Sequence, residues 1–294
     1  TDQVPFKLLI ALATVVVLWL LWRLLVERML TSPQREATLS RYSGLGWFER
    51  LPATPTGAIA ARSLSYWARD ARYRVGLAVI PVVPIVMIAA LLIAGVPLQL
   101  LAWLPVPIMC LFLGWTVHND VAHDSTAFWL HVSSSVAGSA DRWGRLIPAL
   151  MIGIPLVLVG SFATSLVFDN FGALPSFIGL SASVLLFGLG ASSVISAAFP
   201  YPAVHPGSSP FAQPQAAGAT GSVVQSLSFS ITVLSAIPVA ILAFLGETDS
   251  PSWHNLALGV GLVIGVGALV GGVYWGGHIV SKRAPELLAF ALRN

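Results

Sequence analysis

The sequence predicts an all-α, polytopic membrane protein with about seven transmembrane helices, one followed by a block of six. Composition gives the first indication: apolar residues make up 56% of the chain and charged residues only 9%. A soluble domain carries about 25% charged residues. In addition, seven separate stretches approach the roughly 20 apolar residues with which a helix crosses the hydrocarbon core of a bilayer. The chain is therefore expected to fold in lipid.

The seven predicted spans are joined by short connections, and two of them contain paired prolines. Pro81 and Pro84 in the second span, and Pro105 and Pro107 in the third, are expected to kink these helices. The predicted spans are Phe6–Val26, Val75–Gly95, Leu98–Val117, Gly144–Phe168, Pro175–Phe199, Ser226–Gly246 and His254–Gly276.

The basic residues are distributed unevenly, and their distribution orients the spans. Nine of the fifteen lysines and arginines lie between Arg23 and Arg74. By contrast, the connections around Asp169 and Glu247 contain none. Because cytoplasmic loops carry the excess of Lys and Arg, we expect an external N-terminus and a six-span block with both ends inside. The expected cytoplasmic segments are residues 27–74, 118–143, 200–225 and 277–294.

Several enzyme classes lack their signature residues. Cys110 is the only cysteine, which excludes a disulfide framework and any cysteine-based metal site. The sequence contains no Gly-x-Ser-x-Gly motif and no Gly-x-x-x-x-Gly-Lys-Ser/Thr loop for ATP. None of the six later spans carries a charged or histidine side chain in its middle third, where ion-coupled carriers usually keep one. These spans favour an amphipathic or lipid-like cargo driven from outside the chain.

Residues 55–73 have the pattern of an amphipathic helix with Thr56 as a plausible N-cap. A helix with an arginine face and a tryptophan-bearing apolar face is expected to lie in the membrane interface, attracted by anionic headgroups. The alternative is a basic juxtamembrane segment with no further role. One predicted face holds Arg62, Ser65, Arg69 and Arg72, and the other Ala60, Leu64, Trp67, Ala68 and Ala71.

Residues 118–143 predict a helix–turn–helix elbow between the second and third spans of the block. Residues 125–132 read as a short helix, which Ser133–Ser135 and Gly138 interrupt. Asp141 and Arg145 are spaced i, i+4 for an ion pair in the helix that follows.

The same stretch raises the alternative of a membrane-bound, metal-dependent enzyme. His118, Asp120, His123, Asp124 and His131 lie within fourteen residues. However, the histidines are five and eight residues apart, so they align only loosely on a helix, and a di-iron membrane site needs more of them. We therefore expect no metal ligands here.

Two other segments have simpler compositions. Residues 200–225 are rich in Pro, Gly, Ser and Gln and predict a loop, with a plain connector as the simplest interpretation. The last span carries small-xxx-small spacings that allow a neighbouring helix to pack closely. Its glycines are Gly261, Gly265, Gly267, Gly271, Gly272 and Gly276.

This layout resembles the membrane subunits of type-2 ATP-binding-cassette exporters, which have the type V exporter fold. Those permeases have an amphipathic connecting helix, six spans with both ends inside, and a coupling helix between the second and third spans. Residues 55–73, 75–276 and 118–143 match these parts in order. The coupling segment of the family is matched by Asn119, Asp124, Trp129-Leu130 and Gly144-Arg145, whereas Ser133–Ser135 replace a frequent Pro-Ser. Residues 247–253 leave little room for the usual re-entrant helices.

The resemblance implies a permease subunit without catalytic residues or cofactors of its own. Phe128, Trp129 and Leu130 would form an aromatic projection that inserts into a cytoplasmic ATPase subunit. Asp124, Asp141, Arg142 and Arg145 would set its angle and anchor it at the membrane surface. ATP and Mg²⁺ would bind in a dimer of partner ATPases. Other implied partners are a second permease block and membrane lipid, but no nucleic acid. Alternatives are the metal enzyme above and a non-transporting accessory subunit.

The resemblance also implies a division of the chain into four parts. These are a first span (1–26), a basic linker with the connecting helix (27–74), the permease block (75–276) and a cytoplasmic tail (277–294). The chain begins with Thr1, and its first span stands apart from the block. We therefore hypothesise that this span ends a preceding block of a fused permease. The expected location is the plasma or inner membrane of a prokaryotic cell.

Overall fold

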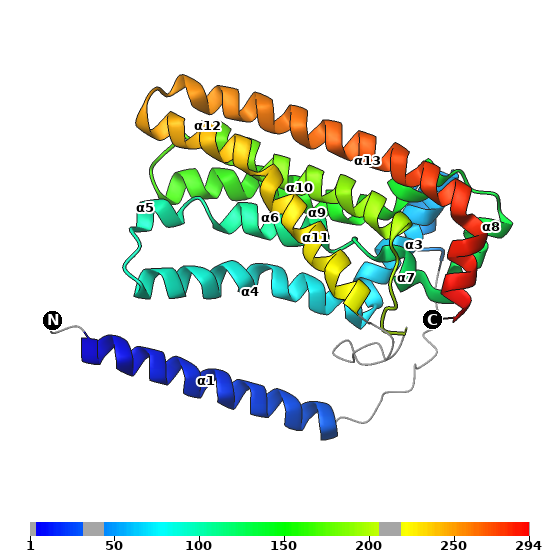
Figure 1. Cartoon of the computed structure of the whole chain (residues 1–294), viewed down its shortest axis with the longest axis horizontal. Coiled ribbons are helices and arrows are strands. Elements are labelled where there is room, and N and C mark those ends of the chain that lie inside the picture. Colours follow the sequence, from blue (N-terminus) through cyan, green and yellow to red (C-terminus); the bar gives the residue numbers. More distant parts are fainter. Residues whose placement is uncertain (1–3, 32–43, 206–218, 294) are drawn as a thin grey trace. The chain divides into compact units, whose positions relative to one another are not determined.

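A computed structural model describes residues 4–31, 44–205 and 219–293 of the chain. The contacts within it define two compact units, Thr1–Leu45 and Gly46–Asn294. Every regular element in the described ranges is a helix, and six helices are long and apolar enough to cross a membrane. The predicted class, an all-α polytopic membrane protein, is confirmed (Figure 1).

The first unit contains one helix, α1 (Val4–Thr31), which includes the predicted first span. Its apolar stretch Ala11–Leu24 has no polar face. Near the end of this stretch, Arg23 Nε donates a hydrogen bond of 2.9 Å to Glu27 Oε1 one turn later. Between Lys7 and Arg23 the helix carries no charged side chain on any face, as expected of a helix surrounded by lipid.

Six apolar spans form the body of the second unit. Two of them are interrupted: α5 (Leu98–Leu101) precedes α6 (Pro105–Trp115), and α11 (Ala219–Ser235) precedes α12 (Ile237–Thr248). The other spans are single helices: α4 (Ala71–Ile93), α9 (Gly138–Val167), α10 (Leu174–Ala198) and α13 (Ser252–Arg293), the last with a kink at Arg283.

Shorter helices lie before the first span and between the second and third. Helices α2 (Trp47–Arg50) and α3 (Pro55–Arg69) precede α4. The predicted elbow consists of α7 (Asp120–Asp124), the 3₁₀ helix η1 (Ser125–Phe128) and α8 (Trp129–Ser133). These pieces lie at the end of the second unit opposite to α5 (Figure 1).

The prolines of the predicted third span break the helix instead of kinking it. Residues 102–104 separate α5 from α6, and Pro105 stands at the first position of α6. Proline suits this position because its fixed φ matches a helix and the N–H it lacks has no intrahelical partner there. Pro81 and Pro84, in contrast, lie inside the continuous helix α4.

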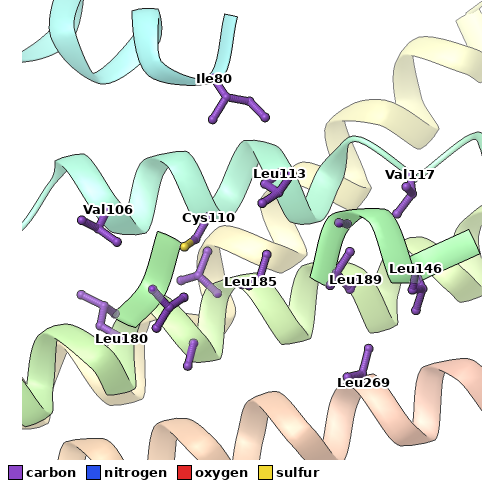
Figure 2. Close-up of a cluster of buried hydrophobic side chains, with 14 of the residues drawn as sticks. Ile80, Val106, Cys110, Leu113, Val117, Leu146, Leu180, Leu185, Leu189 and Leu269 are labelled. Atoms are coloured by element: carbon purple, nitrogen blue, oxygen red, sulfur yellow. The ribbon is translucent and has the colours of Figure 1, made fainter. Parts of the chain in front are cut away.

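Helix α10 is the central element of the core. Its side chains Leu180, Leu185 and Leu189 are buried and point into a cluster formed with α6, α9 and α13 (Figure 2). Members from these neighbours include Leu113 of α6 and Leu269 of α13. Because α10 has neighbours on most of its circumference, it is the most buried of the six spans.

Glycines hold α13 close to α10. A Cβ atom added at Gly261 would lie 2.3 Å from the carbonyl oxygen of Gly179, and one at Gly272 would lie 2.2 Å from that of Gly190. Gly265 and Gly276 also face α10 backbone. The other two predicted packing glycines, Gly267 and Gly271, have no atom within 4 Å of such a Cβ. These two residues lie on a different side of α13 and take no part in its close contact with α10.

The boundaries of the second unit also differ from the predicted four-part division. The connecting helix α3 packs on α9, where Ile59 fills the space beside Gly144. The predicted tail continues α13 as far as Arg293, with a non-helical residue at Arg283 just before Pro285. Beyond this kink, Leu287 and Ala291 are buried against the elbow. Residues 46–74 and 277–293 are therefore parts of the same compact unit as the spans.

Candidate functional site

The elbow is fixed at its start by an asparagine. The Asn119 amide donates to the carbonyl of Tyr201 (2.9 Å) and accepts from the Tyr201 N–H (3.2 Å), which ties the elbow to the segment after α10. Two serines, Ser125 and Ser135, have φ near +50°, so the chain turns sharply before η1 and after α8. α8 ends at Ser133, as predicted, but Gly138, which was expected to interrupt the helix, is the first residue of α9.

Behind the elbow lies a buried ion cluster of three aspartates and three arginines. Arg142 binds Asp141 on one side and Asp120 on the other, the latter at 3.2 Å. Arg145 binds Asp124, and its Nε lies 2.9 Å from Asp141 Oδ1. The cluster therefore joins α7 to the first two turns of α9, and the predicted Asp141–Arg145 pair is confirmed.

The third arginine of the cluster comes from the connecting helix. Arg62 of α3 donates to Asp124 at 2.6 Å. Burial alone would raise the pKa of Asp124, but the guanidinium groups of Arg145 and Arg62 outweigh it and hold that pKa below its ordinary value. Asp124 is thus ionised at neutral pH and bridges two helices that are far apart in the sequence.

Burial distinguishes this cluster from surface ion pairs. The side chains of Asp141 and Arg142 are each 1% exposed. Ser196 of α10 adds a hydrogen bond from its hydroxyl to Asp120, and His131 Nδ1 lies 2.5 Å from Asp141. Three carboxylates and three guanidinium groups balance in charge, which is the condition under which ions are tolerated in a protein interior.

The structure corrects the prediction for the connecting helix. The apolar residues Leu64 and Trp67 are buried within the protein, so this face does not lie against lipid. Arg62 faces Asp124 instead of headgroups, and Arg72 belongs to α4, where it pairs with Asp70 at 2.6 Å. Only Arg69 of the three arginines is exposed.

The N-cap of this helix also differs from the prediction. The hydroxyl of Thr54, not Thr56, accepts the hydrogen bond from the Gly57 N–H (3.1 Å). Pro55 occupies the first helical position, a position that proline favours. The helix therefore begins at Pro55, two residues before the start at Gly57 that Thr56 as the N-cap would imply.

The predicted aromatic projection is divided between the interior and the surface. Phe128 is fully buried, where it packs with Val121 of α7 and Leu287 of α13. It cannot insert into another protein, so this part of the prediction is wrong. Trp129 and Leu130, in contrast, are 52% and 43% exposed and lie side by side at the start of α8. The elbow thus presents two large apolar residues on a buried ionic base.

The histidines of the elbow have separate partners. His118 stacks on the Trp115 ring, with centroids 4.1 Å apart, and contacts the Tyr201 hydroxyl. His123 Nδ1 lies 2.9 Å from the Asn119 carbonyl, and His131 faces Asp141. Across the described residues, no three His, Cys, Asp or Glu side chains converge on a point where they could hold a metal ion.

Asp120, Ser196 and Tyr201 are the site residues that the sequence did not single out for this role. Asp120 and Asp124 are spaced i, i+4, which was the only available signal that both face the same side of α7. Tyr201 lies in the predicted loop 200–225, where it contacts His118 and accepts a hydrogen bond from Gln225. Its segment is therefore more than a connector. Residues 206–218 of that loop lie outside the described ranges, and α11 begins at Ala219.

The buried His118 predicts a pH dependence of stability. Burial lowers the pKa of His118 from 6.5 to about 4, so the imidazole is neutral in the folded protein. Between these two pH values the unfolded chain binds more protons, and the free energy of unfolding must fall as the pH is lowered. A shift of this size corresponds to roughly 3 kcal/mol. We expect His118→Gln to lose correspondingly less stability between pH 6.5 and pH 4 in detergent unfolding experiments.

The comparison of pH profiles isolates His118 from its neighbour. The pKa of His123 is also lowered by burial, but His123 is present in both proteins and cancels in the difference. Parallel profiles for the parent protein and His118→Gln would contradict the assignment of a buried, neutral imidazole at position 118.

No relative of this chain was found among known proteins. No protein-family model, curated protein or solved structure matches it.

Proposed function

We propose that the protein is the permease subunit of an ATP-driven exporter of the ATP-binding-cassette type, with the elbow as the surface on which a partner ATPase acts. The observation that carries the proposal is the combination of exposed Trp129 and Leu130 with the buried ion cluster behind them. An apolar contact on a rigid base is what a force-transmitting surface requires. A mobile loop would absorb the motion instead.

The connections of the elbow support this role. Its ion pairs lead directly into α9 through Arg142 and Arg145, and into α3 through Arg62. Phe128 adds an apolar contact with the end of α13. A displacement of the elbow would therefore move two spans and the connecting helix together. In the proposed cycle, ATP binding and hydrolysis in the partner move this unit and change the packing of the six spans between two states.

The proposed cargo is an amphipathic or lipid-like molecule. The spans offer no charged side chain in their middle thirds to bind a proton or a sodium ion. The energy of transport would come from a dimer of cytoplasmic ATPases, and a second permease block would complete the pathway. The chain would lie in the plasma or inner membrane of a prokaryotic cell with its C-terminus in the cytoplasm.

The exposed pair Trp129 and Leu130 gives the test of this proposal. We expect the full-length protein, purified in mild detergent, to carry an ATPase that the variant Trp129→Ala/Leu130→Ala loses. Because both side chains are largely exposed, their loss should leave folding intact. Mass spectrometry identifies and quantifies the co-purified ATPase, and an ATPase assay measures the ATP turnover of the eluate. We expect the variant to decrease the amount of ATPase and the turnover at least tenfold, since buried aromatic anchors dominate protein interfaces.

A matched control separates docking from general loss of exposed aromatic surface. Trp275 on α13 is 66% exposed, and Trp275→Ala should retain the ATPase. The proposal fails if no ATPase accompanies the parent protein from its native membrane, or if Trp129→Ala/Leu130→Ala retains as much of it as Trp275→Ala does.

A further inference from the structure

A second site lies at the end of the unit away from the elbow. A cavity of about 380 Å³ opens between the α5–α6 connection, the turn from α9 to α10, and helix α12. Its back wall includes the buried residues Phe177 and Leu180 of α10. Both α5 and α12 lie at the end opposite to α7 and α8 (Figure 1). A cavity of this volume is in the range that small organic ligands occupy.

Within the described part of the chain, four aromatic side chains line the walls of this cavity. Trp103 and Phe177 pack against each other with ring centroids 4.2 Å apart, and Phe168 and Phe244 line further parts of the wall. The faces of such rings carry partial negative charge and attract organic cations within about 6 Å. Tryptophan is the strongest of the three aromatic residues in this respect.

One carboxylate lies on the rim of the cavity and is held in place. Glu247 Oε1 accepts a hydrogen bond of 2.9 Å from Asn170 Nδ2. The other end of the Asn170 amide accepts from the Ala173 N–H at 3.2 Å, which fixes the amide relative to the start of α10. This arrangement leaves Glu247 Oε2 to bind a ligand. None of the described residues that line the cavity is basic, so the charge of Glu247 has no cationic partner there.

We propose that this cavity binds an organic ammonium ion with an apolar body, with Glu247 as the counter-ion and the aromatic walls around the cationic group. A neutral apolar ligand would use the walls but gain nothing from the carboxylate, which is exposed on the rim. An anion would be repelled by Glu247. The same chemistry is available from a free lipophilic ammonium compound and from the choline headgroup of a lipid.

Binding of a matched pair of probes tests the proposal. We would measure 4-phenylbutyl-trimethylammonium and its carbon isostere 2,2-dimethyl-6-phenylhexane on the full-length protein in nanodiscs, after correction for partitioning into empty nanodiscs. We expect saturable binding of the ammonium probe alone. Glu247→Gln retains the size and the hydrogen bond to Asn170, yet should weaken binding at least tenfold. Phe244→Leu, at an exposed position of the wall, should weaken it several-fold.

Asp249→Asn is the control for net charge, because Asp249 is an exposed acid near Glu247 that does not line the cavity. We expect it to bind the probe as the parent does. Equal binding of the isostere, unchanged affinity in Glu247→Gln, or an equal loss in Asp249→Asn would each overturn the proposal.

Two lipid compositions distinguish the sources of the ligand. Lower probe affinity in phosphatidylcholine than in phosphatidylglycerol nanodiscs, with the difference abolished in Glu247→Gln, identifies the lipid headgroup as the natural occupant. Equal affinity in both identifies a free cation. The measurement needs no ATPase, so its failure would leave the proposed exporter function untouched, and loss of the ATPase partner would leave this site untouched.

Discussion

Replacing Gly272 with alanine is expected to force α13 away from α10 and to destabilise the protein strongly. The added Cβ would lie 2.2 Å from the Gly190 carbonyl oxygen, and both atoms belong to rigid helical backbone. This steric clash can therefore be relieved only if a whole helix moves. Overpacking of a close-packed core costs about 1–3 kcal/mol, and a backbone clash of this kind belongs at the upper end. Thermal unfolding in detergent, followed by light scattering, would show a markedly lower midpoint.

The adjacent residue supplies the control. Gly271→Ala adds the same methyl group to the same helix, but no atom lies within 4 Å of its Cβ position. Because alanine favours a helix over glycine by up to about 1 kcal/mol, this variant should be as stable as the parent or slightly more so. If the two variants unfold at the same temperature, the close contact between α10 and α13 is wrong.

Replacing Arg142 with methionine is the second change for which we expect a large effect. The variant keeps an unbranched side chain in place but leaves Arg145 as the only buried arginine beside both Asp141 and Asp120 among the described residues, so the buried carboxylates outnumber their cations. Removing one member of a buried ion pair typically costs about 3–5 kcal/mol. For a chain of this size that corresponds to a decrease of roughly 10 °C in the unfolding midpoint.

Arg23→Met provides the comparison with an exposed pair. Arg23 and Glu27 form a similar ion pair on α1, but both side chains are 60% exposed. Exposed pairs contribute at most about 1 kcal/mol, so this variant should unfold close to the parent. If Arg142→Met is no less stable than Arg23→Met, the ion cluster does not hold the elbow in place.

The fold class could be predicted because lipid imposes a strong constraint on composition. A run of about 20 apolar residues is rarely found outside a transmembrane helix. In a chain with few charged residues, the charges that flank each run mark its ends clearly. The interruptions of the spans were harder to predict. Pro105 is compatible both with a kink inside a helix and with the start of a new one, and only the packing of α6 on α10 decides between them.

The candidate site was predicted in part, and its errors have a common cause. Helical periodicity shows which residues share a face, but it does not show what that face contacts. Arg62 and Trp67 were correctly separated, yet both face protein and not lipid. Phe128 and Trp129 are neighbours in one short apolar run, yet Phe128 ends η1 and is buried, whereas Trp129 begins α8 and is exposed.

The same limit explains the glycines of α13. Gly265 and Gly267 both belong to small-xxx-small spacings, and the sequence does not distinguish them. In the structure, only Gly265 faces α10. The spacing of glycines therefore predicts that α13 packs closely on another helix. Only the position of α10 shows which of these glycines make the contact.

The contact between the end of α13 and the elbow has a consequence for the order of assembly. Val121 and Phe128 are made after the second of the six spans, but Leu287 and Ala291, which cover them, follow the last of these spans. Until then the underside of the elbow remains uncovered. The surface that presents Trp129 and Leu130 is consequently completed only after all six spans have been synthesised. A nascent or prematurely terminated chain would lack it.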